Sequence, residues 1–287
     1  MKKYLFYLLL PLAALSSCED PIELEVEAQE KQLSVDAFLN NLPETQKIIL
    51  KRSKGFFEGG TQQAVTGANV KVVSSDGKTY LFQDSDNDGV YTWNDSVLVH
   101  EGLNYQLSIE YDGEVYTASQ TANPVPSIDS IVTGQLEPAF GPPAEPGDLQ
   151  VELFAKDLPN RNDYYWFRYY RNDTLNTNPG GINAALNGGD SFDSDGVLFI
   201  PPIRFVSFND FDRPYKAGEK IKIQIWSINR DTYLFLKQVA SQINNGGLFA
   251  VPPSNVRTNI VSSSDAVEKK AIGMFSISMI TEQEANF

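Results

Sequence analysis

Apolar and polar residues alternate strictly in five segments of the chain, which predicts β-strands with one buried face and one solvent-exposed face. The five segments lie at residues 33–37, 69–72, 105–111, 149–156 and 220–225. Asp-Gly pairs recur at the spacing of hairpin turns, at residues 76–77, 88–89 and 112–113. These residue types favour tight turns, so the pattern indicates antiparallel sheets.

A single segment has helical spacing instead. Its apolar residues are separated by three or four positions, at Leu236, Val239, Ala240 and Ile243. Asp231 is expected to be the N-cap residue of this helix, and Asn245-Gly246-Gly247 is expected to end it. The predicted fold class is therefore all-β, with two β-sandwich units of the immunoglobulin or transthyretin type and one helix in the second unit.

The proline-rich sequence Asn123-Pro124-Val125-Pro126 predicts a boundary between these two units. We expect an N-terminal β-sandwich over residues 32–122 and a C-terminal β-rich domain with one helix over residues 123–287. Within the second unit, residues 172–196 are rich in Asn, Gly and Asp and predict an irregular segment. Loops of this length are often functional or mobile.

Residues 1–17 have the pattern of a lipoprotein signal peptide. Two lysines precede an apolar stretch that is shorter than the roughly 20 residues of a membrane-spanning helix. The stretch ends in Leu15-Ser16-Ser17-Cys18, which resembles the bacterial lipobox, and Cys18 is the only cysteine of the chain. We therefore predict lipidation at Cys18. An ordinary signal peptide followed by an incidental cysteine is the alternative.

Lipid chains at Cys18 would hold the protein at a membrane without a spanning segment. Acidic residues predominate directly after Cys18, so residues 18–31 are expected to form an extended acidic tether. This acidic start also resembles the surface-export signal of Bacteroidota lipoproteins. The expected location is the outer membrane, facing the cell surface in preference to the periplasm.

Composition narrows the classes of function. The chain has 287 residues, with 23 basic and 37 acidic side chains and a formal net charge of −14. Nucleic-acid binding is disfavoured because phosphate contacts need a basic surface. One His and one Cys exclude a zinc cluster of Cys and His ligands, and neither a nucleophile elbow nor a phosphate-binding loop is present. We expect no enzymatic activity, and a glycosidase that uses a pair of the many carboxylates is the alternative that composition leaves open.

An acidic loop is the sharpest internal motif. Residues 84–89 place acids at positions 1, 3 and 5 and glycine at position 6 of a calcium-binding loop. The candidate calcium ligands are Asp84, Asp86, Asp88 and, at position 12 where Glu is usual, Asp95. Strand-like residues flank the loop, so it does not belong to a helix–loop–helix hand. An acidic hairpin loop without calcium is the alternative.

An aromatic run at residues 164–170 is the second candidate site. Tyr165, Trp166 and Tyr169 are candidate binding residues, either for stacking on sugars or for contact with a protein. Alternate residues of a strand face opposite sides, however, so half of the run is expected to be core.

Several short sequences, taken in order, resemble the Bacteroidota outer-membrane lipoprotein family known as domain of unknown function 4249. They lie at residues 18–21, 33–37, 65–70, 89–91, 102–107, 125–131, 254–256 and 271–275. The resemblance implies a lipoprotein that is commonly encoded beside a TonB-dependent receptor, and it implies no catalytic residues. One departure follows Asn259-Ile260, where the family often has a glycine-rich stretch and this chain does not.

These observations together predict a non-enzymatic, lipid-anchored envelope lipoprotein. We expect it to act as an accessory or ligand-capture partner of a TonB-dependent outer-membrane β-barrel receptor. A surface adhesin that binds glycans or proteins is the alternative.

Overall fold

The computed structural model describes residues 31–54, 59–137, 143–177, 182–187, 208, 213–245, 256–266 and 269–287. The predicted signal peptide, Cys18 and the tether up to residue 30 lie outside these residues. Within the described ranges, no helix combines the length and apolar character needed to cross a membrane.

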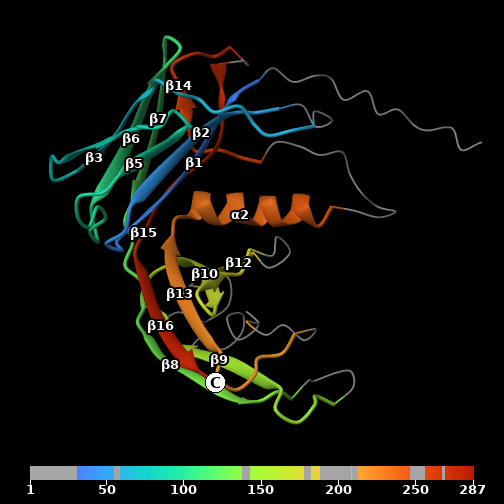
Figure 1. The fold of residues 1–287 in the computed structure, drawn as a ribbon. Coiled ribbons are helices and arrows are strands. Elements are labelled where there is room, and N and C mark those ends of the chain that lie inside the picture. The colour runs from blue at the N-terminus through green and yellow to red at the C-terminus, as the bar shows by residue number, and fades with distance from the viewer. Residues whose placement is uncertain are drawn as a thin grey trace, which may run out of the picture.

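The body is built almost entirely of strands, which form two lobes joined in a crescent (Figure 1). The described strands are β1 (Leu33–Asn40), β2 (Gln46–Arg52), β3 (Asn69–Ser74), β4 (Thr79–Phe82), β5 (Val90–Trp93), β6 (Asn104–Tyr111), β7 (Glu114–Thr121), β8 (Ile128–Gln135), β9 (Leu149–Ala155), β10 (Asp163–Arg171), β11 (Thr174–Leu175), β12 (Asn183–Asn187), β13 (Lys220–Ile228), β14 (Val261–Ser262), β15 (Ala271–Ser278) and β16 (Ile280–Asn286). The predicted all-β class is confirmed, and the five alternating segments correspond to β1, β3, β6, β9 and β13.

The N-terminal lobe is a sandwich of two sheets. A four-stranded sheet in the order β15-β1-β2-β5 packs against a five-stranded sheet in the order β14-β7-β6-β3-β4. Alternate side chains of both sheets point into one core, for example Val35 and Leu50 from the first sheet and Val72 and Leu107 from the second. This is the burial that the period-two pattern predicted.

Two strands of this sandwich come from the far end of the chain. β15 runs parallel to β1, with Leu33 paired to Ala271 and Asn40 to Ser278, and β14 pairs with β7. The predicted N-terminal unit of residues 32–122 is therefore incomplete, because residues 261–262 and 271–278 belong to its sheets. The physical reason is that strand pairing is set by tertiary packing, which a local pattern does not report.

The C-terminal lobe has a sheet in the order β11-β10-β13-β16, with β12 also paired to β10. The β8–β9 hairpin covers one face of this sheet and encloses a second core, which includes Val151, Phe167 and Ile223. β16 follows β15 after only one residue, Met279, so the last two strands belong to different lobes.

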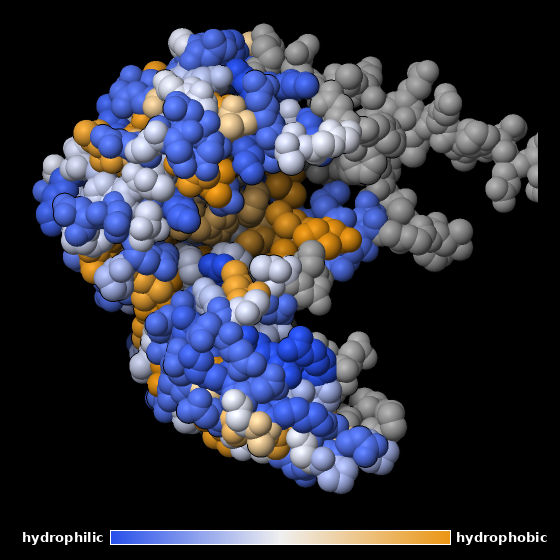
Figure 2. All heavy atoms as spheres, viewed as in Figure 1, coloured by the Kyte–Doolittle hydropathy of each residue, from blue (hydrophilic) through white to orange (hydrophobic). Residues whose placement is uncertain are grey.

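Helix α2 (Arg230–Ile243) lies on the concave side of the crescent. The predicted helix is confirmed, but its N-cap is Asn229, and the expected cap Asp231 lies in the first turn, where a negative charge favours the helix dipole. The Asn229 side chain donates a hydrogen bond to the Thr121 carbonyl at 2.9 Å and thus ties the helix start to the N-terminal lobe. Figure 2 shows apolar atoms gathered around this helix at the middle of the concave side.

Candidate functional site

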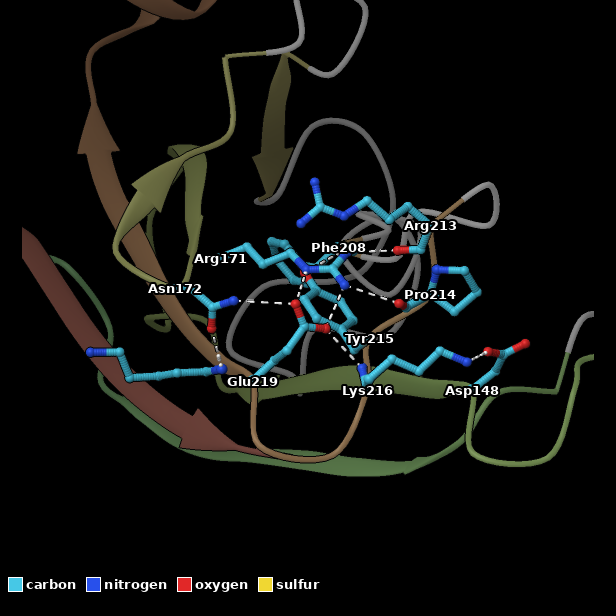
Figure 3. Close-up of polar contacts among 10 residues, drawn as sticks. Asp148, Arg171, Asn172, Phe208, Arg213, Pro214, Tyr215, Lys216 and Glu219 are labelled. Atoms are coloured by element: carbon cyan, nitrogen blue, oxygen red, sulfur yellow. Dashed lines mark hydrogen bonds and ion pairs between the residues drawn. The ribbon is translucent and has the colours of Figure 1, made fainter.

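A pocket of about 350 Å³ lies in the C-terminal lobe, beside the β10–β11 hairpin. Its lining residues come from the end of β10, from β11 and the residues that follow it, and from the segment before β13. They are Tyr169, Arg171, Asn172, Thr174, Leu175, Asn176, Thr177, Arg213 and Tyr215. Figure 3 shows the polar contacts of four of these lining residues, Arg171, Asn172, Arg213 and Tyr215, with their neighbours.

The hairpin turn beside the pocket follows from two residues that tolerate left-handed backbone. Asn172 and Asp173 have φ values of 47° and 64°, as the central residues of a type I′ turn require. The Asn172 side chain accepts a hydrogen bond from the Lys220 backbone N–H at 2.8 Å and donates one to Glu219 at 3.2 Å. The turn is therefore fixed against the start of β13.

Arg171 is the lining residue that connects the pocket to its surroundings. Its Nε and Nη2 atoms donate to the two carboxylate oxygens of Glu219 at 2.9 and 2.5 Å. Its Nη1 and Nη2 atoms also donate to the carbonyl oxygens of Arg213 and Pro214 at 2.6 and 3.0 Å. One guanidinium thus holds the strand, the segment before β13 and a carboxylate in a single geometry (Figure 3).

The charges of this pair are only slightly exposed, with side-chain accessibilities of 15% for Arg171 and 18% for Glu219. Hydrogen bonding from Arg171 is the main reason why the pKa of Glu219 lies below its ordinary value, although burial opposes the shift. Glu219 is therefore ionised at neutral pH and balances the charge of Arg171.

Aromatic rings make one wall of the pocket rigid. Tyr215 is almost fully buried, stacks on Phe287 with ring centroids 4.4 Å apart, and donates its hydroxyl to the Phe208 carbonyl at 2.9 Å. Arg171 lies over the other face of the Tyr215 ring, 4.5 Å from its centroid. Tyr169 meets Phe208 edge to face at 5.5 Å.

The three residues predicted from the aromatic run do not form one platform. Tyr165 is fully buried and donates its hydroxyl to the buried carboxylate of Asp157 at 2.7 Å, so it is a core residue. Trp166 points to the opposite face of β10, where it packs 5.6 Å from the rings of Phe38 and Trp226. Tyr169 is the one of the three that lines the pocket.

The acidic loop between β4 and β5 brings together three of its four predicted calcium ligands. Carboxylate oxygens of Asp84, Asp86 and Asp88 lie within 4.8 Å of one another, and Asp95 is outside this group. The Asp84 carboxylate already accepts hydrogen bonds from the backbone N–H groups of Asp88 and Gly89, at 3.1 and 3.2 Å. Calcium binding by this loop stays a prediction.

Sequence reasoning missed Arg171 and Arg213. The two residues are 42 positions apart in the chain, and the fold brings the Arg171 side chain to the Arg213 carbonyl oxygen. The one usable signal is the turn-forming pair Asn172-Asp173, which directly follows Arg171 and therefore places it at a strand end.

The sheets and their cores define an all-β protein made of sandwich-like layers, with a small pocket at the side of one layer. The chain matches the family model described as Domain of unknown function (DUF4249) over residues 19–284, and it belongs to that family. The resemblance seen in the short sequence segments is thereby confirmed. No curated protein matches the chain.

Proposed function

We propose that this protein is a non-enzymatic, lipid-anchored envelope lipoprotein that captures a small ligand for a TonB-dependent outer-membrane receptor. The observation that carries the capture role is the pocket beside Arg171. Its volume of about 350 Å³ lies near the lower end of the range for small-molecule sites. Its lining residues Arg171 and Tyr215 are held in place by hydrogen bonds and ring stacking. A preformed pocket binds without a large cost of ordering.

The proposed lipid anchor and the proposed partnership with a receptor are supported by the sequence alone. Cys18 would carry the lipid, and the acidic residues after it would serve as the tether to the folded body. Attachment to the same membrane as the receptor raises the effective concentration of one protein near the other. The adhesin alternative relies on the aromatic run together with the long loops, and β10 divides the aromatic run between two faces.

Crosslinking and pull-down from native envelopes tests this role. We expect the wild-type protein to sediment with membranes and to recover a β-barrel receptor. Cys18→Ser should release the protein into the soluble fraction and abolish the recovery, whereas Ser16→Ala, which keeps a small residue in the lipobox, should behave as wild type. Membrane-attached protein that recovers no β-barrel receptor would refute the proposed partnership.

A further inference from the structure

Three aromatic rings from both lobes meet on the concave side of the crescent. Phe38 of β1 lies 5.6 Å from Trp166 of β10, and Trp166 lies 5.6 Å from Trp226 of β13, measured between ring centroids. The three residues belong to the apolar cluster that also contains Leu236 of α2. Figure 2 shows that this side is hollowed between the lobes and that apolar atoms line the hollow. Phe38 and Trp166 are half-buried, so both rings keep surface for contact with a ligand.

Arg168 places a cation beside these rings. It lies two positions after Trp166 on β10, and therefore on the same face of the strand. Its guanidinium lies 4.9 Å from the ring centroids of both Trp166 and Trp226. Among the residues that the structure describes, the half-buried guanidinium has neither a hydrogen-bond acceptor nor an ion-pair partner. Its N–H donors are therefore available to an anionic group of a ligand.

Asp36 places a carboxylate on the same side of the molecule, from the other lobe. It precedes Phe38 by two positions on β1, so both side chains point away from the N-terminal core. Asp36 is exposed, and within the described ranges its carboxylate has neither a hydrogen bond nor an ion pair. Burial by the surrounding atoms nevertheless raises its pKa, against the attraction of Lys51 and Arg168, as expected for a solvent-accessible group in a hollow.

The hollow thus presents a cation and an anion that attract each other without forming an ion pair. Lys51 attracts Asp36 and Glu44 attracts Arg168, so the next charges outward are again one of each sign. A simple anion would be repelled by Asp36, and a simple cation by Arg168. A neutral ligand would cover both charges without pairing them. A zwitterion with an apolar body matches the whole pattern.

Hydrogen bonds hold the hollow in place before any ligand binds. Trp226 donates its indole N–H to the Gln224 side chain at 2.9 Å, and the Gln224 amide donates to Glu282 at 2.7 Å. At the junction of the lobes, Asn41 accepts a hydrogen bond from the Ile280 backbone N–H at 2.7 Å and donates one to the Ile280 carbonyl at 3.3 Å. A site fixed in this way binds with a small cost of ordering.

We infer that the hollow between the lobes binds a free aromatic amino acid in its zwitterionic form. The ligand carboxylate pairs with the Arg168 guanidinium, and the ligand ammonium group pairs with the Asp36 carboxylate. The ligand ring packs on Phe38 and Trp166. This site lies on the opposite face of β10 from the pocket beside Arg171, so the inference goes beyond the capture role proposed for that pocket.

Three probes that share one ring test the assignment on the full-length protein in detergent at neutral pH. Phenylalanine carries both charges, phenylalaninamide lacks the carboxylate, and N-acetylphenylalanine lacks the ammonium group. We expect phenylalanine to bind with a Kd below about 1 mM, and each derivative to bind at least about tenfold more weakly. Calorimetric titration measures the affinities. Tryptophan emission reports contact with the site, because two of the three tryptophans of the chain lie in it.

Variants of the two charged residues locate the binding. Arg168→Gln and Asp36→Asn should each weaken binding of phenylalanine at least about tenfold. In Asp36→Asn, phenylalanine and N-acetylphenylalanine should bind equally, because the ammonium group has lost its partner. Arg52→Gln and Asp129→Asn are the matched controls, since the Arg52 guanidinium also lies over a ring, 5.2 Å from the centroid of Tyr111, and Asp129 is also an exposed strand residue. Both controls should bind phenylalanine as the wild type does.

Three results would overturn the inference: phenylalanine does not bind below about 1 mM, either derivative binds as tightly as phenylalanine, or either charge variant binds as the wild type does. The probe comparison uses the wild-type protein, so it decides the question even if a variant fails to fold. These outcomes are independent of the envelope pull-down, which tests the receptor partnership.

Discussion

Replacing Glu219 with Gln should destabilise the C-terminal lobe through one defined interaction. The substitution keeps the shape of the side chain, removes its charge and exchanges one acceptor oxygen for an amide donor. In either orientation of the side chain that amide would face Arg171, which donates to both carboxylate oxygens of Glu219. It would also face either the Asn172 side-chain amide or the Lys216 backbone N–H, which donate to Glu219 at 3.2 and 2.8 Å. Breaking a fully buried ion pair costs about 3–5 kcal/mol, and a charged hydrogen bond contributes about 1.5–3 kcal/mol.

The Glu219 side chain keeps 18% of its accessibility and Gln retains one acceptor, so we expect a loss of about 2 kcal/mol in the free energy of unfolding at pH 7. Urea denaturation followed by tryptophan fluorescence measures this loss. Glu284→Gln is the matched control, because Glu284 is 51% exposed and lies 3.7 Å from Lys220. An exposed pair of this kind should contribute less than about 0.5 kcal/mol.

The loss should also depend on pH in a direction fixed by the pKa of Glu219. Arg171 holds that pKa below the ordinary value of 4.5, so the carboxylate stabilises the folded state above pH 4.5. The stabilisation disappears as the pH falls through the lower folded-state pKa. The difference between wild type and Glu219→Gln should therefore be full at pH 7 and shrink below pH 4.5. A difference that is absent at pH 7, or unchanged across the acid range, would refute this account.

Three further changes have expected outcomes. Gly273→Ala should cost more than about 3 kcal/mol or prevent folding, since φ is +100° there and a Cβ would lie 1.9 Å from the Val35 carbonyl oxygen. Gly134→Ala, with open space around it, should leave the Tm unchanged, and equal Tm values for the two variants would contradict the argument. Calcium added after chelation should raise the Tm of the wild type but not of Asp84→Asn, and an unchanged wild-type Tm would exclude a calcium site. Tyr165→Phe should cost about 1–3 kcal/mol in urea denaturation, because it leaves a buried carboxylate without its hydroxyl donor, and a loss below about 0.5 kcal/mol would oppose this reasoning.

Strict alternation of apolar and polar residues predicted β6 and missed β15, and the burial of the two strands gives the reason. β6 alternates between buried and exposed positions, so its period of two is visible in the sequence. Six of the eight residues of β15 are buried, and five of these are consecutive, so it shows no such period. Its partner β1 lies at the other end of the chain, and no local signal encodes a pairing over that distance.

Of the two candidate sites, the sequence predicted the one made of a single continuous segment and missed the one made of separate segments. Asp84 and its neighbours were found because a continuous segment supplies all of them at a fixed spacing. The pocket was missed because Arg171 and Arg213 belong to separate segments that meet only in the folded lobe. Tyr169 was identified by residue type alone, and alternation correctly warned that half of its run would be core.

The placement of β15 has a consequence for how the molecule is made. The ribosome makes β1 well before β15, because the paired residues Leu33 and Ala271 are 238 positions apart in the chain. At about 5–20 residues per second, β1 waits on the order of 10–50 s with one edge open. Closure of the first sheet is therefore a late event, and a frameshift in the final strands would damage the earliest-made lobe as well as the last.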